Sequence, residues 1–166
     1  STESIIRKAV KKAVTILARQ FVFKPTIEEG MKFTESEKYK KNIFSFDMLG
    51  EGARTMEDAE RYFQDYINSI HAVGKLLNNS SEIKYANGVS IKISALHPRY
   101  ERNKSDDLEK ELLPKLVKLC EISKQYNIQL CIDAEENYRL ILSLKILDKL
   151  SSNRNLLGWN GLGLAV

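Results

Sequence analysis

Short apolar runs alternate with longer segments of helical periodicity through most of this chain. The runs are apolar at nearly every position, which is typical of strands in a parallel sheet covered on both faces. The intervening segments place apolar residues three or four positions apart, as an amphipathic helix does. This alternation predicts an α/β fold with parallel strands joined by right-handed helical crossovers. The predicted strands span residues 42–46, 89–95, 128–132 and 161–166.

Each of the three predicted helices has an apolar stripe, and each has a predicted start. The first begins at Thr55, with Asp58 as its capping-box partner. The second begins near Ser105 and contains Pro114, where we expect a kink or a restarted helix. The third begins near Glu136. The positions expected to face the core are Ala59, Tyr62, Phe63, Tyr66, Ile67, Ile70, Val73 and Leu77 in the first helix, Leu108, Leu112, Leu113, Leu116, Val117 and Cys120 in the second, and Leu140, Ile141, Leu144, Leu147 and Leu150 in the third.

The first 41 residues differ in charge from the rest of the chain. Apolar spacing predicts a helix over residues 4–21, which Pro25 ends because proline restricts the residue before it and lacks an N–H. Thr26 and Glu29 have the capping-box spacing that starts another helix. Ten basic and five acidic residues give this segment a charge of +5, whereas sixteen basic and seventeen acidic residues give the remainder −1. We therefore divide the chain into a helical lead-in, 1–41, and a main domain, 42–166.

Composition places the chain among ordinary globular proteins. It has 166 residues, of which 43% are apolar, and this is enough for one domain with a sizeable core. Neither a long apolar run nor a signal peptide is recognisable, so we expect no membrane span. Cys120 and Cys131 have no metal-ligand spacing and form no disulfide framework, and we interpret both as reduced core residues. These features favour a cytoplasmic location.

The strongest candidate for chemistry is a lysine within the second predicted strand. Lys92 lies between Ile91 and Ile93, and a charged side chain in such a strand is unfavourable without a partner. In a barrel the Lys92 face would be the interior, and the lysine would be an anion receptor. The third predicted strand ends directly before Asp133. Because parallel strands bring their carboxyl ends to one edge, where α/β enzymes place functional groups, we expect Asp133 near Lys92.

Two more carboxylates, Asp47 and Glu51, bracket the loop after the first predicted strand. They could hold a cation, accept a proton or pair with an arginine. Gly50 and Gly52 flank Glu51, which indicates backbone torsions that other residues rarely adopt. No phosphate-binding glycine loop, nucleophile elbow or zinc-ligand spacing is recognisable, and we expect no metal.

Structural interpretations of the same residues remain open. Lys92 could be a surface lysine of an edge strand, and Asp133 and the glutamates at 135–136 could cap the next helix. The carboxylates of the first loop could simply be solvated. We expect structural roles for both histidines, His71 on a helix face and His97 in a strand-end loop.

Several segments of the chain match, in order, the sequence of a known enzyme domain. They are Ser45-Phe46-Asp47-Met48-Leu49-Gly50-Glu51, the run from Ser90 to Tyr100, Ile132-Asp133-Ala134-Glu135-Glu136, and the shorter segments 20–22, 26–29 and 158–163. Together they resemble the proline dehydrogenase domain of bacterial bifunctional proline utilisation A. The resemblance implies the first half of a (β/α)8 TIM-like barrel, in which four parallel strands alternate with helices after a helical arm.

The resemblance also implies an activity and roles for individual residues. The enzyme would use FAD to oxidise L-proline to Δ1-pyrroline-5-carboxylate and would pass the electrons to a membrane quinone. Lys92 would bind the substrate carboxylate together with two arginines, and Asp133 would be the catalytic residue that organises the polar network around substrate and flavin. Ala134 would lie against the flavin. Glu51 would pair with one of the arginines and help close the site, and Asp47 would be a further polar group there.

The family barrel has eight strands, whereas this sequence predicts four. The two substrate arginines and the flavin-binding loops of the other half are not in it. We therefore expect this polypeptide by itself to bind FAD poorly and not to oxidise proline. Its exposed strand edges could pair in a homodimer. The resemblance allows for peripheral association with the inner membrane, and for DNA binding only if a separate domain lies upstream.

Two other classes of protein compete with this interpretation. The basic amphipathic lead-in could bind nucleic acid or an anionic membrane, which would make the chain a binding module on an open α/β scaffold. Salt-dependent binding of DNA or anionic vesicles by residues 1–41 would distinguish this module from an enzyme. A flavodoxin-like domain would need a phosphate loop after its first strand, where residues 47–52 are too acidic.

Overall fold

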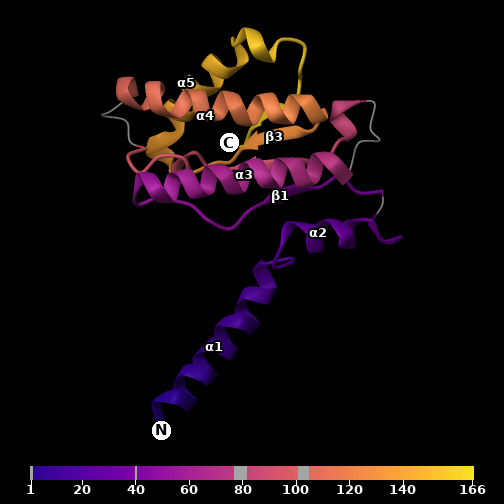
Figure 1. Ribbon diagram of the computed structural model, residues 1–166, viewed down its shortest axis with the longest axis vertical. Helices are drawn as coiled ribbons and strands as arrows, with labels where there is room; N and C mark the ends of the chain where they lie inside the picture. The colour runs from indigo at the N-terminus through magenta and orange to yellow at the C-terminus, as the bar shows by residue number, and fades with distance from the viewer. Residues whose placement is uncertain (1, 40, 77–81, 101–104) are drawn as a thin grey trace. The chain divides into compact units, whose positions relative to one another are not determined.

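The structure is a computed structural model that describes residues 2–39, 41–76, 82–100 and 105–166 (Figure 1). The chain divides into two compact units, residues 1–41 and 42–166.

The first unit contains two helices, α1 (Thr2–Phe21) and α2 (Ile27–Thr34). The predicted capping signal between them is confirmed, because the Glu29 N–H donates to Thr26 Oγ1 at 3.2 Å. The Phe33 ring contacts the ring of Phe23 at a centroid distance of 4.9 Å. Several large apolar side chains of α1 are exposed, and they include Ile5, Ile6, Val10, Val14 and Leu17.

The second unit is a four-stranded parallel sheet with a helix after each of its first three strands. Spatial order follows chain order, β1-β2-β3-β4, and every neighbouring pair is parallel. This is the arrangement of half a (β/α)8 barrel, so the predicted fold class is confirmed. The elements are β1 (Ser45–Asp47), α3 (Met56–Leu76), β2 (Gly88–Ile91), α4 (Ser105–Tyr126), β3 (Gln129–Ile132), α5 (Leu140–Ser151) and β4 (Leu162–Leu164).

The core lies between the sheet and helices α3 and α4, which run side by side in Figure 1. Alternate residues of β2 and β3 point into it, because successive strand side chains face opposite sides. Each large side chain of this kind stabilises the fold by roughly 1.5–3 kcal/mol relative to an exposed position. The members of this core with at most 1% exposure include Val89, Ile91, Leu130, Ile132, Ala59, Tyr66, Ile70, Val73, Leu112, Leu116 and Cys120.

The opposite face of the sheet corrects the expectation that both faces are covered by apolar residues. One row across the four strands is formed by Asp47, Ser90, Cys131 and Gly163. Asp47 is exposed, and Cys131 and Gly163 are partly exposed. The residues of this row are small or polar, whereas those of the core face are apolar.

The strand boundaries also differ from the sequence prediction. The predicted strand 89–95 ends at Ile91, and Ile93–Ala95 forms a 3-10 turn instead. The prediction was wrong because a strand continues only while its neighbours supply ladder partners, and apolar composition does not report this. The consequence is that Lys92 lies at the carboxyl end of β2 rather than in its middle.

The helices agree with their predicted starts and inward faces, except for α5. The Thr55 and Asp58 capping box is present, with Asp58 N–H donating to Thr55 Oγ1 at 3.0 Å and Thr55 N–H to Asp58 Oδ2 at 3.2 Å. Helix α4 continues through Pro114 without a restart. Leu77, predicted to face the core from α3, lies outside the described residues.

Among the described residues, no helix combines the length and the apolarity needed to cross a bilayer.

The exception is α5, whose predicted inward face is wrong at three of its five positions. Leu140, Ile141 and Leu144 are exposed by 38–48%, whereas Leu150 is buried as predicted. Apolar residues occur around much of the circumference of this helix, so their spacing does not select one inward face. The side chains that α5 buries are Leu142, Ser143, Ile146 and Leu150.

Close approach of two strands makes Gly88 a sensitive position in the sheet. A Cβ at this residue would lie 2.6 Å from the Gln129 carbonyl oxygen, which is backbone and has little freedom to move. We expect Gly88→Ala to lower the free energy of unfolding by about 2 kcal/mol, measured by urea denaturation. Gly163→Ala is the matched control, because its Cβ would meet only Cys131 Sγ at an ordinary 3.8 Å. Equal stability of the two variants would contradict the predicted clash.

Candidate active site

The carboxyl ends of three neighbouring strands bring one cation and two carboxylates together. Asp47 is the last residue of β1, Lys92 follows β2, and Asp133 follows β3. Lys92 Nζ lies 2.8 Å from Asp47 Oδ1 and 2.8 Å from Asp133 Oδ2. We refer to these three residues as the Lys92 cluster. The predicted proximity of Lys92 and Asp133 is therefore present in the structure.

Burial and hydrogen bonding make the Lys92 cluster electrostatically distinct. The Lys92 side chain is only 15% exposed. Desolvation by itself would lower the Lys92 pKa, but hydrogen bonds to Asp133 and Asp47 outweigh it and raise the pKa above its ordinary value. Lys92 Nζ also lies 2.8 Å from Asp47 Oδ2, so Asp47 accepts through both carboxylate oxygens and Asp133 through one. With two carboxylates and one ammonium, the cluster has a net negative charge.

The backbone around the cluster is fixed by hydrogen bonds between strands and from a helix. The Asp133 N–H donates to the Ile91 carbonyl at 2.9 Å. The Lys92 N–H donates to the hydroxyl oxygen of Tyr66, a residue of helix α3, at 3.0 Å. Burial raises the Tyr66 pKa to about 12, so its hydroxyl stays protonated at neutral pH.

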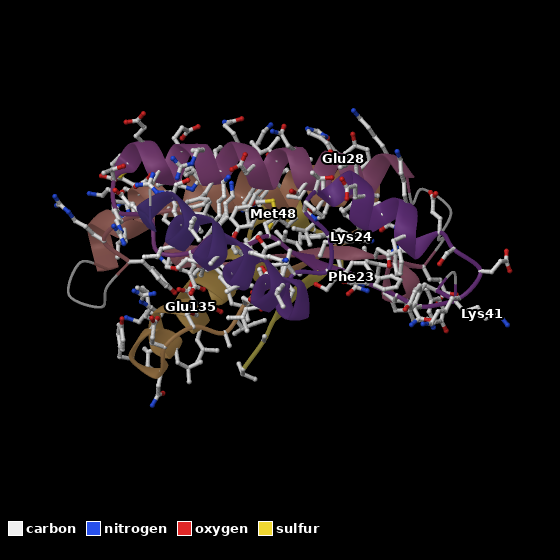
Figure 2. The ribbon with its side chains drawn as sticks, turned by 90° about the horizontal axis from the view of Figure 1, so that it is seen from below. Phe23, Lys24, Glu28, Lys41, Met48 and Glu135 are labelled. Atoms are coloured by element: carbon white, nitrogen blue, oxygen red, sulfur yellow. The ribbon has the colours of Figure 1, made fainter. Side chains whose placement is uncertain are left out.

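Glu135, for which the sequence predicts only a helix-capping role, has a buried carboxylate. Its side chain, which is labelled in Figure 2, is 7% exposed and lies 2.8 Å from Arg139 Nη1. Glu135 Oε1 also accepts the Ser94 N–H at 3.0 Å, two residues beyond Lys92. Arg139 pairs in addition with exposed Glu136 at 2.8 Å. The spacing of four between Glu135 and Arg139, typical of helix ion pairs, is the signal that could have identified this contact.

Ser94 connects the loops that follow β1, β2 and β3. Besides its N–H bond to Glu135, its Oγ accepts the Gly52 N–H at 3.2 Å and its carbonyl accepts the Ala53 N–H at 2.9 Å. The start of the first loop is held by α3, where Ser69 Oγ donates to the sulfur of Met48 (Figure 2). The three loops are thus held in one arrangement at the same end of the sheet.

Two predicted site residues are not joined to the Lys92 cluster. Glu51 is exposed, and within the described ranges it has no hydrogen bond or ion pair. Its neighbours have the positive φ angles that the sequence indicated, 143° at Gly50 and 63° at Gly52. Ala134 follows Asp133 and is exposed. The roles of Glu51 towards an arginine and of Ala134 towards a flavin stay predictions.

The histidines have the structural contacts expected of them. His97 Nδ1 accepts the Arg99 N–H at 3.1 Å, and its Nε2 lies 3.0 Å from Glu111 Oε2, so His97 shapes the loop after the 3-10 turn. His71 Nδ1 lies 3.0 Å from the Tyr126 hydroxyl.

Among the described residues, the cysteines and carboxylates form no recognisable metal site. Both cysteines are free thiols, with Cys120 buried and Cys131 only partly so. Burial raises the pKa of Cys120 to about 12. Across the part of the chain that the structure describes, no group of three or more metal-ligating side chains is present.

The strands of this parallel sheet neighbour one another in chain order, and a charged cluster lies at their carboxyl ends. Together these two features define the class of (β/α)-barrel enzymes. A family model described as proline dehydrogenase matches residues 31–166. The bifunctional protein PutA of Escherichia coli strain K12 is 43% identical over 166 residues, all of this chain and 12% of that protein. The chain belongs to the proline dehydrogenase family, and it spans about an eighth of the length of the curated relatives it matches. The binding-module alternative has no support from these matches.

Solved structures agree with this assignment. A crystal structure of a Bradyrhizobium japonicum PutA mutant has a TM-score of 0.72 at 43% identity, covering 76% of this chain and 13% of that chain. PutA from Bdellovibrio bacteriovorus, at 20% identity, has a TM-score of 0.83 over 96% of this chain and 18% of that chain, and this shows the shared fold alone.

Proposed function

We propose that this chain supplies the first four strands of a barrel that oxidises L-proline to Δ1-pyrroline-5-carboxylate. The observation that carries the proposal is the Lys92 cluster at the carboxyl ends of the strands, in a chain that belongs to the proline dehydrogenase family. Proline is a zwitterion, and the cluster offers an ammonium for its carboxylate and two carboxylates for its ring nitrogen. Binding in this way would hold the ring carbon beside the nitrogen in one orientation.

The Lys92 ammonium can receive the substrate carboxylate beside its present partners. The two oxygens of the Asp47 carboxylate lie too close together to take one N–H each, so one of the three N–H donors is left for the substrate. Asp47, with a side chain 45% exposed, is also freer to move than Asp133 at 28%. Further cations would balance the net negative charge of the cluster. The two arginines that the family resemblance implies would supply them. Glu51, exposed in the first loop, is available to pair with one of them.

The residues present are compatible with an FAD cofactor. Ala134 presents only a methyl group at the exposed position after β3, and the sheet face on the Asp47 side carries the small residues Ser90 and Gly163. Ala134 and Asp133 are the residues of this chain that would contact the flavin. When bound, FAD supplies the acceptor for the hydride that proline loses. The chain's own contribution is position and charge, through Lys92 and its two carboxylates.

We propose a membrane quinone, reached from the cytoplasmic side, as the final electron acceptor. Support comes from the family to which the chain belongs. Proline-dependent reduction of a soluble quinone analogue by the natural full-length protein is expected, and reduction of nicotinamide in its place would contradict the proposal.

The activity is tested with proline, FAD and a dye acceptor. We expect no turnover from residues 1–166 alone, and turnover when the chain is joined to the second half of the E. coli PutA barrel. Bound flavin, read from its visible spectrum, reports whether the joined protein has folded. A joined protein that binds flavin but does not oxidise proline would overturn the proposed function, and robust turnover by the isolated chain would overturn the predicted dependence on the second half.

A further inference from the structure

A tyrosine hydroxyl from α3 lies at the point where strand β2 ends. Tyr66 is 1% exposed, and its hydroxyl oxygen accepts the Lys92 N–H at 3.0 Å. The two residues are 26 positions apart in sequence, so this contact exists only because α3 packs on β2. No other helix side chain bonds to the Lys92 backbone in the described ranges.

The contact completes the hydrogen bonding of the backbone at this position. The preceding carbonyl, of Ile91, accepts from Asp133 N–H at 2.9 Å, and the Lys92 carbonyl accepts from Ala95 N–H at 3.1 Å. The β2 ladder ends at Ile91, so Tyr66 takes the place of the strand partner that Lys92 N–H lacks. A buried N–H without an acceptor is unfavourable, and the backbone would move to find one.

We propose that Tyr66 is a positioning residue for the proposed proline oxidation: its hydroxyl fixes the Lys92 backbone so that the ammonium lies between Asp47 and Asp133. The expected effect on proline kinetics rests on the function proposed above. The expected effect on the position of Lys92 does not. Tyr66 acts through Lys92 and does not contact the substrate. Its hydroxyl stays neutral at physiological pH, so it adds no third negative charge beside the two carboxylates.

The test compares two tyrosine-to-phenylalanine variants of the natural full-length protein. Tyr66→Phe removes the bond to Lys92 N–H and keeps the ring. Tyr126→Phe is the matched control, since it removes a bond of the same length, 3.0 Å, to His71 Nδ1. Tyr126 is the last residue of α4 and precedes β3, whereas the Lys92 cluster follows the strands.

Two readouts are measured for each variant. With proline as substrate, Tyr66→Phe is expected to raise KM about 10-fold with a smaller change in kcat, and Tyr126→Phe is expected to change neither. The second readout does not depend on activity: acylation of the Lys92 amine by an amine-reactive reagent, followed by mass spectrometry, is expected to be several-fold faster only in Tyr66→Phe.

The outcomes separate this inference from the proposed function. Unchanged KM and unchanged Lys92 acylation in Tyr66→Phe, with stability lowered equally in both variants, would show that the hydroxyl is merely structural and would overturn the proposal. If no form oxidises proline but Lys92 acylation rises only in Tyr66→Phe, the proposed function fails while the positioning of Lys92 by Tyr66 stands.

Discussion

Replacing Lys92 with methionine in the natural full-length protein is expected to lower kcat/KM for proline by about 100-fold or more, equivalent to roughly 3 kcal/mol. Methionine keeps most of the side-chain volume but removes the ammonium that pairs with Asp47 and Asp133 at 2.8 Å. The substrate carboxylate would then face two carboxylates without the cation between them. Steady-state kinetics with a dye acceptor measures the effect.

A lysine outside the cluster provides the control for this substitution. Lys84 is 62% exposed and forms a pair with Glu82 at 3.0 Å, so Lys84→Met is expected to leave kinetics unchanged. Adding Asp47→Asn to Lys92→Met should relieve the repulsion between the two carboxylates and recover part of the lost stability, but none of the activity. Full activity of Lys92→Met would contradict the site proposed for proline.

Replacing Glu135 with alanine is expected to lower the free energy of unfolding by about 3 kcal/mol. The substitution removes the buried partner of Arg139 and leaves the Ser94 N–H without its acceptor. Arg139 would keep only its exposed partner Glu136, and an unpaired donor is unfavourable away from water. Urea denaturation, followed by circular dichroism, measures the change.

The neighbouring glutamate allows a matched comparison. Glu136 lies at the same 2.8 Å from Arg139 Nη1, but its side chain is 56% exposed. Because exposed ion pairs contribute little, Glu136→Ala is expected to lower stability by less than about 1 kcal/mol. Equal losses in the two variants would mean that burial of Glu135 does not determine the strength of its ion pair.

Local signals in the sequence identified the elements and part of the site. The Thr55 and Asp58 capping box and the apolar stripes of α3 and α4 depend on neighbours a few positions apart, and the structure agrees with them. The meeting of Lys92 and Asp133 could also be predicted, because parallel strand order places consecutive strand ends at one edge. The roles expected for Glu51 and Ala134 depend on groups outside the described chain, and they stay predictions.

The sequence by itself thus determined four parallel strands alternating with helices and the meeting of Lys92 with Asp133, since strand and helix periodicities and caps are encoded locally. The half-barrel followed from the family resemblance. Only the tertiary structure decided that β2 ends at Ile91, that Asp47 and Asp133 share Lys92, and that Glu135 is buried against Ser94. Glu135 and Ser94 are 41 positions apart, and Tyr66 and Lys92 are 26 apart. Such contacts depend on how helices pack on the sheet, and no periodicity along the chain records that packing.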